Sequence, residues 1–230
     1  TVSVDGFLQE GEQPGQTTLV MTVLDKPFYT SQVLLDNFGD KNTGITRASA
    51  QLNVNGLVGE GDQLNFYGLH TQGSDYLRAG WTTNVPEADR GQRIGLYASR
   101  MDYNIISTSF QSARITGAAE VMGMEATDPL IRSRTANAML SLNFAHSRFK
   151  SWSDGVFSAD RAYTSDVALF GVSGNQIDSW QGGGLSVASF MVSSGTIDRV
   201  PSSDANHVGG QFAKLRYGFN RTQNLQPDLS

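Results

Sequence analysis

The sequence contains no cysteine. This absence excludes disulfide bonds, catalytic thiols and metal sites built on cysteine. Proline is also scarce, at 6 residues, and charged residues make up only 17% of the chain, against about 25% in a typical soluble domain. A disordered chain is excluded, because disordered chains are poor in aromatic residues and 10% of these residues are aromatic. The 25 glycines favour a β protein with many turns.

The chain also lacks any apolar run that approaches the ~18 residues of a transmembrane helix. If it crosses a membrane, it must therefore do so as a β-barrel, because only helices and closed barrels satisfy their backbone groups in lipid. The sequence begins without Met, at Thr1, in what reads as the middle of a strand, and it ends in a polar stretch at 226–230. We expect it to be a fragment of a longer protein.

Little in the sequence points to catalysis, metal binding or nucleic acid. The 17 lysines and arginines are scattered and the net charge is −5, so no basic surface for nucleic acid is predicted. His70, His146 and His207 stand singly, without a second ligand at metal spacing. Oxygen-bearing side chains at 36–42 suggest either calcium or a tight hairpin, and the hairpin is favoured because Lys41 dilutes the negative charge. We expect no metal, no cofactor and no enzymatic activity.

The strongest positive signal is an alternation of apolar and polar residues with a period of two. Successive side chains of a strand point to opposite faces, so each such segment has one apolar and one polar face. The polar faces hold mostly Ser, Thr, Asn, Gln and Gly, as a water-filled lumen requires, whereas the outer faces of a soluble sandwich carry charge. The alternating segments are 47–54, 76–85, 136–144 and 213–220.

Four cations fall on the polar positions of these segments: Arg47, Arg78, Lys214 and Arg216. We predict that they face the lumen, where they either tune the field of a pore and contact passing polypeptide or pair with carboxylates across the lumen. The apolar positions would face lipid, as at Leu77, Trp81, Leu140 and Leu142. Aromatic residues near strand ends are expected to form interfacial girdles, and these are Tyr29, Tyr103, Phe149, Trp152 and Trp180.

The expected connections sort by length. From the fifth onward, long connections (105–115, 151–162, 197–206) alternate with short ones (128–133, 174–178) and therefore lie at opposite ends of the strands. Short turns on one side and long loops on the other are typical of outer-membrane barrels. A sandwich with Greek-key crossings would not sort its loops in this way. A soluble barrel or sandwich remains the alternative. The other expected connections are 38–42, 56–61, 71–74 and 86–91.

Three short motifs follow one another along the chain. They are Leu35-Asp36-Asn37-Phe38-Gly39, Gly61-Asp62-Gln63-Leu64 and Pro129-Leu130-Ile131-Arg132-Ser133-Arg134. In this order and spacing they resemble the outer-membrane transporters of two-partner secretion, the TpsB or haemolysin-activator (ShlB-type) family. The resemblance marks Asp36, Asn37, Gly39, Gly61, Asp62, Pro129 and Arg132 as structural residues of the family motifs. The family's Val-Arg-Gly pore-loop motif has no counterpart here and would lie beyond Ser230.

The resemblance implies an all-β protein with an antiparallel transmembrane β-barrel. Residues 1–28 would be the C-terminal hairpin of a periplasmic POTRA domain, and 29–230 would supply about ten strands of a larger barrel. The implied function is an outer-membrane pore that exports a partner exoprotein of haemolysin or adhesin type, with that exoprotein and outer-membrane lipid as its partners. A general porin, a membrane-assembly barrel and a soluble secreted β-sheet binding protein are the alternatives.

Overall fold

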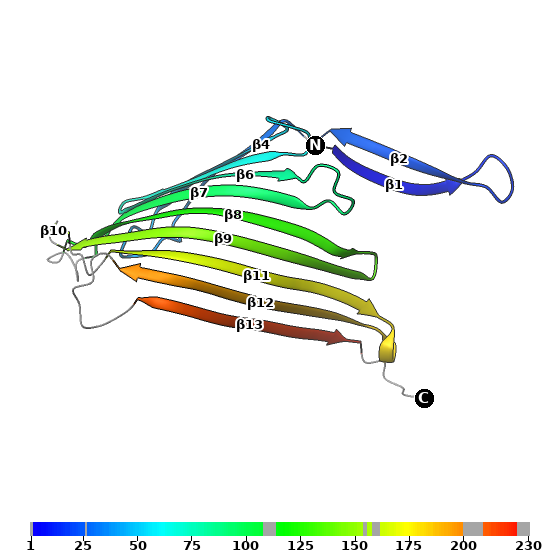
Figure 1. Cartoon of the computed structure of the whole chain (residues 1–230). Coiled ribbons are helices and arrows are strands. Elements are labelled where there is room, and N and C mark those ends of the chain that lie inside the picture. Colours follow the sequence, from blue (N-terminus) through cyan, green and yellow to red (C-terminus); the bar gives the residue numbers. More distant parts are fainter. Residues whose placement is uncertain are drawn as a thin grey trace.

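The computed structural model describes residues 2–25, 27–107, 114–153, 156–157, 162–199 and 209–224. Antiparallel strands make up nearly all of this part of the chain (Figure 1). The strands are β1 Val2–Glu10, β2 Thr17–Asp25, β3 Tyr29–Asp36, β4 Arg47–Asn55, β5 Gln63–Thr71, β6 Ser74–Asn84, β7 Arg93–Asn104, β8 Thr116–Arg132, β9 Ala136–Ser153, β10 Val156–Phe157, β11 Tyr163–Asp178, β12 Gly184–Arg199 and β13 Gly210–Gln223.

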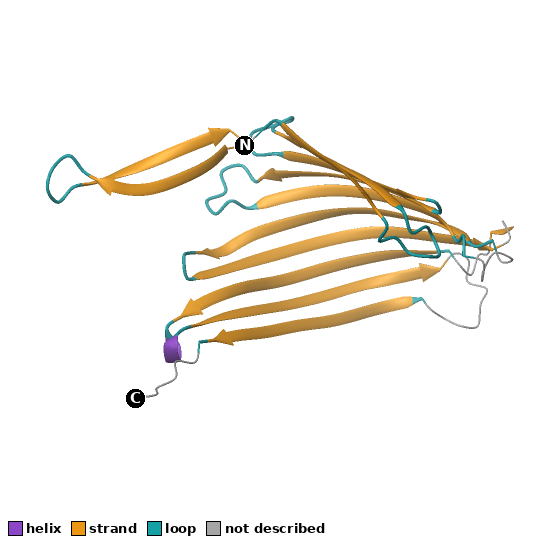
Figure 2. Ribbon diagram, turned by 180° about the vertical axis from the view of Figure 1, so that it is seen from behind, coloured by secondary structure: helices purple, strands orange, loops and turns teal. Residues whose placement is uncertain are grey.

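The strands form two sheets. β1 and β2 make a separate hairpin, and the rest form an 11-stranded sheet in which β3 to β9 and β11 to β13 follow one another as a meander while β10 pairs with β9. Each strand of the meander pairs with the next one in the chain, as an up-and-down barrel requires. The sheet curves, and within the described residues its two edge strands, β3 and β13, do not pair with each other (Figures 1 and 2). The predicted fold class, an incomplete antiparallel barrel, is confirmed.

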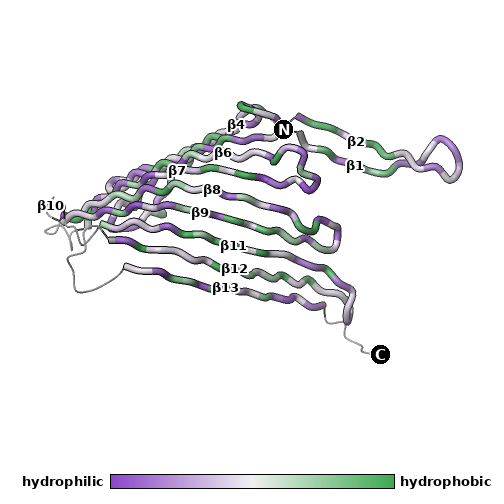
Figure 3. Tube along the Cα trace, in the orientation of Figure 1, coloured by the Kyte–Doolittle hydropathy of each residue, from purple (hydrophilic) through white to green (hydrophobic). Residues whose placement is uncertain are grey.

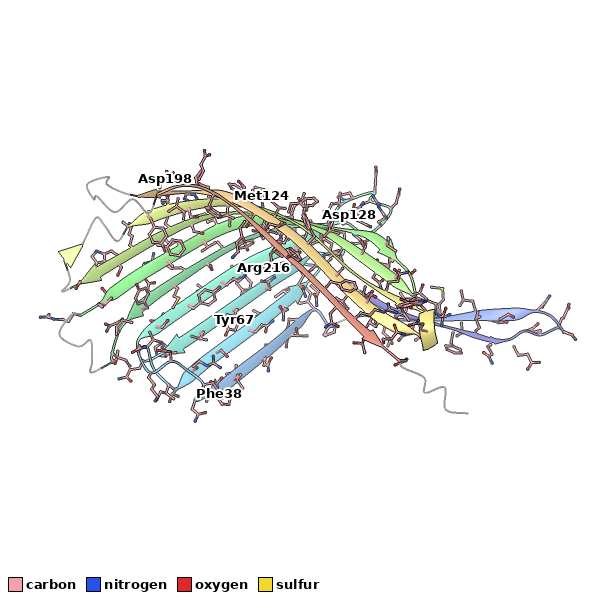
Figure 4. All side chains as sticks on the ribbon, turned by 90° about the horizontal axis from the view of Figure 1, so that it is seen from below. Phe38, Tyr67, Met124, Asp128, Asp198 and Arg216 are labelled. Carbon is pink, nitrogen blue, oxygen red and sulfur yellow. The ribbon has the colours of Figure 1, made fainter. Side chains whose placement is uncertain are left out.

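The alternation predicted from the sequence holds along the strands (Figure 3). The register sets Trp81 against Leu96, Leu96 against Met124 and Met124 against Phe144, so an apolar row crosses four strands at one height. In Figure 4, Met124 lies on the convex side of the sheet, and Tyr67 and Arg216 lie on the concave side. We call these two sides the apolar face and the polar face.

The apolar face is not buried against any second layer. Ala162 is the one buried hydrophobic residue in the described part of the chain, whereas Leu77 is 62% and Phe219 71% exposed. A soluble sandwich would bury such side chains between its sheets. Contiguous exposure of large apolar residues on one face is instead what a barrel presents to lipid.

Helix is almost absent from the described residues. The one helical element described is the short 3₁₀ turn Trp180–Gly182 between β11 and β12. No helix in the part of the chain the structure describes is long and apolar enough to cross a membrane.

Three predicted turns are wrong, and two of these lie in the later strands of the sheet. The turn expected at 128–133 belongs instead to β8, which continues to Arg132 through a bulge between Pro129 and Ile131 that accommodates the proline within the ladder. The turn expected at 174–178 is the end of β11, which pairs with β12 as far as Asp178. Both strands are longer than the sequence suggested, because a proline and a glycine were taken as chain reversals.

From the β7–β8 connection onward, the connections sort by length. Short links at 133–135 and 179–183 lie at one end of the sheet, and the β7–β8, β9–β11 and β12–β13 connections lie at the other (Figure 2). The β1–β2 hairpin projects from the end with the short links (Figure 1). Much of the longer connections, including the predicted 197–206, falls outside the described residues.

Asn55 joins the hairpin to the sheet. Its backbone N–H donates to the Phe28 carbonyl at 2.8 Å, and its side-chain amide donates to the Pro27 carbonyl at 3.0 Å. Because Asn55 is the last residue of β4, these two bonds fix the entry to β3 at the end of the sheet with the short connections.

Candidate functional site

The register places all four predicted cations on the polar face. Arg78 lies opposite Ser99 on β7, and Arg47 lies opposite Thr71 on β5. Lys214 belongs to a cross-strand row that runs through Ser193, Leu169, Asn143 and Glu125, and Arg216 follows two residues later on the same face. The four cations are therefore spread along one face and form no cluster.

Arg47 is part of a tight ion pair. Its Nε and NH2 donate to the two carboxylate oxygens of Asp36 at 2.7 and 3.0 Å, and the Asp36 side chain is only 10% exposed. Asp36 also accepts the Phe38 N–H at 2.9 Å. The pairing joins neighbouring strands at the end of β3. Arg47 is therefore positioned to hold an edge hairpin together and has little free charge to offer.

Arg78 instead belongs to a network that spans the polar face. Its guanidinium carbon lies 4.4 Å from the ring centroid of Tyr97, and the amide of Asn143 donates to the Tyr97 hydroxyl at 3.2 Å. Arg78 and Tyr97 come from β6 and β7, and Asn143 comes from β9 beyond β8. The Tyr97 ring crosses β8 over Gly123, where a Cβ atom would collide with the ring. The glycine thus makes room for the tyrosine.

We expect Gly123→Val to break this network. The added side chain would displace the Tyr97 ring, remove its contacts with Arg78 and Asn143, and cost about 1–3 kcal/mol of stability from overpacking and lost contacts. The measurement is the unfolding free energy of the refolded complete protein. Gly68→Val on β5, where a Cβ meets nothing within 4 Å, is the matched control. Equal losses in both variants would contradict the proposed role of Gly123.

Lys214 and Arg216 have no ion-pair partner among the described residues. They lie on β13, an edge of the sheet. Their charges therefore remain available on the polar face, unlike that of Arg47.

The first family motif forms a cap over neighbouring strand ends. The connection from β3 to β4 is ten residues long, so the predicted tight hairpin at 38–42 is wrong. Gly39 donates to the Ile45 carbonyl at 2.8 Å, and a Cβ at Gly39 would collide with backbone atoms of Gly44 and Ile45. The carbonyl of Thr43 accepts the Gly73 N–H at 2.7 Å, which ties the loop to the β5–β6 turn. Asn37 is exposed in this loop.

The carboxylates of the cap have partners within the chain. Asp36 is committed to Arg47, and Asp40 accepts the backbone N–H of Asn42 at 2.7 Å. The described residues contain no group of three or more acidic or histidine side chains placed to hold a metal ion.

The second motif builds the turn between β4 and β5. Gly61 has φ +81°, a left-handed conformation that favours glycine. Asp62 is 1% exposed, and its Oδ2 accepts the Val58 N–H at 2.9 Å and the Trp81 indole N–H at 3.2 Å. Burial by itself raises the pKa of this carboxyl, but the donors at Val58 and Trp81, with the N–H groups of Gly59 and Gly56, outweigh burial and hold the pKa below its usual value.

The third motif lies where β8 meets the short connections. Pro129 is buried at the bulge, and Arg132 ends the strand opposite Asn137, with its guanidinium beside Gly91 of the β6–β7 turn. Asp128 pairs with Arg90 of the same turn at 3.3 Å. The three motifs thus form contacts at turns and strand ends, at both ends of the strands.

Two residues of the expected aromatic girdle lie on the wrong face. Tyr103 and Phe149 are on the polar face, where Phe149 stacks on Tyr163 with ring centroids 4.6 Å apart. Tyr103 covers Gly117 just as Tyr97 covers Gly123. Nearness to a strand end thus did not predict which residues face the membrane. The face of each residue depends on whether its position in the strand is odd or even. The girdle role of Tyr29, Trp152 and Trp180 stays a prediction.

One large hollow lies on the apolar face. It has a volume of about 670 Å³ and is lined by Trp81, Leu96, Met124, Phe144 and Phe170, among others. It lacks the convergent polar groups of a ligand site. The candidate functional surface of this chain is therefore the polar face itself.

Residues 15–226 match the protein family described as haemolysin secretion/activation protein ShlB/FhaC/HecB. The heme/hemopexin transporter protein HuxB of Haemophilus influenzae is 22% identical over 220 residues, which cover 96% of this chain and 36% of HuxB. HuxB of the Rd KW20 strain is 26% identical over 139 residues, which cover 60% of this chain and 24% of HuxB. The chain therefore spans little more than a third of the length of the curated relatives it matches.

Two solved structures share the fold. CdiB from Escherichia coli has a TM-score of 0.71 at 19% sequence identity, over 94% of this chain and 41% of CdiB. CdiB from Acinetobacter baumannii has a TM-score of 0.59 at 13% identity, over 98% of this chain and 45% of CdiB.

Proposed function

The chain belongs to the haemolysin secretion/activation protein family ShlB/FhaC/HecB, the two-partner secretion transporters, and on this premise we propose that the complete protein is an outer-membrane pore that exports a partner exoprotein. The observation that supports the proposal is the continuous polar face, which crosses all ten strands of the meander opposite an exposed apolar face. Such a sheet, once closed, encloses a hydrated lumen within lipid.

The chemistry of the polar face suits an unfolded polypeptide. One cross-strand row of this face runs through Asn55, Gln63, Thr82, Gly95, Glu125, Asn143, Leu169, Ser193 and Lys214, and most of its polar side chains are uncharged groups that donate or accept hydrogen bonds. These groups replace water around the passing backbone without holding any one sequence tightly. The charges of Lys214 and Arg216, which have no ion-pair partner among the described residues, would add a weak attraction for acidic segments.

The β1–β2 hairpin supports the assignment of residues 1–28 to the end of a POTRA domain. The register sets Val4 against Val23 and Leu8 against Leu19, which gives the hairpin one apolar face. These side chains are 49%, 58%, 72% and 59% exposed, respectively. A two-stranded hairpin is marginal alone, so this face requires further packing from the same domain.

This assignment also sets the orientation. The hairpin lies at the end of the sheet with the short connections, so that end is periplasmic and the longer connections are extracellular. The family description points to haemolysins, and HuxB is described as a heme/hemopexin transporter. For this chain we propose an exoprotein of haemolysin or adhesin type, recognised in the periplasm by the POTRA domains.

Site-specific photo-crosslinking tests the export pore. A photo-reactive amino acid at Ser193, on the polar face, should crosslink to the exoprotein while the complete transporter is secreting it. The photo-reactive amino acid placed instead at the adjacent Val192, which is 36% exposed on the apolar face, should give no such crosslink. Exoprotein crosslinks from both positions or from neither, during active secretion, would refute the proposed path.

A further inference from the structure

The apolar face changes to a charged surface at a defined height on three neighbouring strands. On β9, apolar Phe144 is followed on the same face by His146, Arg148 and Lys150. On β8, Met122 is followed toward the same end of the sheet by Glu120, and on β7 Leu96 and Ala98 are followed by Arg100. Arg148 thus lies about 10 Å beyond Phe144 along the barrel axis. That distance places its guanidinium where headgroups border the hydrocarbon layer.

A small cavity of about 130 Å³ opens at this border. It is lined by Arg100, Ala118, Glu120, Arg148, Lys150 and Trp152. Three of the six lining side chains are cationic and one is anionic, so the cavity favours an anion. An indole beside it is typical of the membrane interface.

The three cations of this cavity differ in whether they have an anionic partner. Arg100 donates to Asp102 at 2.8 Å and to Glu120 at 2.9 Å, which fixes its position and satisfies the nearby carboxylates. Arg148 lies directly opposite Glu120 in the register. Even so, Arg148 and Lys150 have no ion pair or hydrogen bond within the described chain, and both side chains are exposed. Two cations on one strand, four and six residues beyond the apolar row, therefore lack an anionic partner.

From this placement we infer that Arg148 and Lys150 bind a phosphate group of a phosphorylated glycolipid, of the lipid A type, in the outer leaflet. The occupant follows from position and charge: the acyl chains of such a lipid would cover the apolar residues Met122 and Phe144, and its phosphate would reach the two cations. A free phosphate ion would gain only the second contact. The inference rests on the proposed orientation, in which the end of the sheet with the longer connections is extracellular.

The test measures binding of bis-phosphorylated lipid A to the complete transporter in detergent, by native mass spectrometry. The double variant R148Q/K150Q should bind about tenfold or more weakly than the parent protein, because each cation near a lipid surface contributes to phosphate attraction. The control K41Q/R134Q removes the same charge from exposed turns and should bind as the parent does. Heat-modifiable migration on gels verifies that each variant is folded.

Two further measurements are needed. One distinguishes the phosphate of a lipid from free phosphate, and the other distinguishes the proposed lipid site from the proposed export pore. Inorganic phosphate at the same concentration should neither bind nor compete, and effective competition would show a general anion site and overturn the lipid assignment. Equal lipid A affinity of R148Q/K150Q and the parent would also overturn it. Exoprotein secretion should persist in R148Q/K150Q, so loss of lipid binding with secretion intact supports the site without bearing on the pore. Failure of the parent protein to secrete, with lipid binding intact, would count against the pore alone.

Discussion

Leu142→Arg should destabilise the membrane-inserted barrel by about 2–4 kcal/mol, the usual effect of a lipid-facing arginine near the middle of the bilayer. Leu142 is 46% exposed on the apolar face of β9, with Ala126 and Phe170 beside it on the neighbouring strands. Apolar residues extend from Ala138 to Phe144 on this face, so Leu142 lies well inside the apolar band. An arginine there has no nearby headgroup to reach, and the carboxylate on the neighbouring strand, Asp128 opposite Leu140, is already paired with Arg90.

The adjacent Ser141 supplies a control at the same depth. Ser141 lies on the polar face opposite Gly171, which leaves room for a longer side chain. Ser141→Arg should therefore change the unfolding free energy by well under half of the Leu142→Arg effect. The measurement is a denaturant titration of the complete protein refolded into lipid vesicles. A penalty for Ser141→Arg that equals or exceeds that for Leu142→Arg would mean that the two faces have been assigned the wrong way round.

The two faces could be predicted from sequence because they depend only on parity within a strand. Once Leu140 and Leu142 are seen to alternate with Ser141 and Asn143, the side of the sheet for each residue follows from backbone geometry. The same reasoning placed Arg78 and Arg216 on the polar face without any knowledge of the register. The pattern and the sorting of the connections favoured an outer-membrane barrel over a soluble barrel or sandwich, and the resemblance of the three motifs to the secretion transporters decided between them.

Contacts between strands could not be predicted in this way. Tyr97 and Asn143 are 46 residues apart, and their hydrogen bond depends on the register of β7, β8 and β9 together. The cavity beside Arg148 has the same origin, because Arg100, Glu120 and Arg148 come from three strands and align only through two successive pairings. No short motif marks such a row.

The misplaced turn at Pro129 has a more specific cause. A proline lacks the N–H that a strand ladder uses, so its presence argued for a chain reversal. The structure keeps the proline in β8 by shifting the register after it, and the chain reverses only beyond Arg132. The motif that begins at Pro129 thus contains the bulge of β8, and this bulge is why the sequence suggested a turn there.

Asp62→Asn should loosen the turn at 56–62 and remove part of the acid sensitivity of the protein. The carboxylate of Asp62 organises this turn through the N–H groups of Val58 and Trp81. A neutral amide accepts these bonds more weakly and places an NH2 group among further backbone donors. We therefore expect a lower unfolding midpoint for Asp62→Asn at neutral pH.

The pH dependence of that difference follows from the lowered pKa of Asp62 in the folded protein. A carboxyl whose pKa is lower when folded stabilises the protein at pH values above its unfolded pKa, about 4, and this contribution is lost as the pH falls through the folded value. The unfolding midpoints of the parent protein and Asp62→Asn should therefore differ at pH 7 and converge as the pH falls below about 4. Asp89→Asn, in an exposed turn at the same end of the sheet, is the control and should leave the midpoint at pH 7 close to that of the parent. A constant gap between parent and Asp62→Asn down to the lowest pH would show that shape, and not the charge of Asp62, holds the turn.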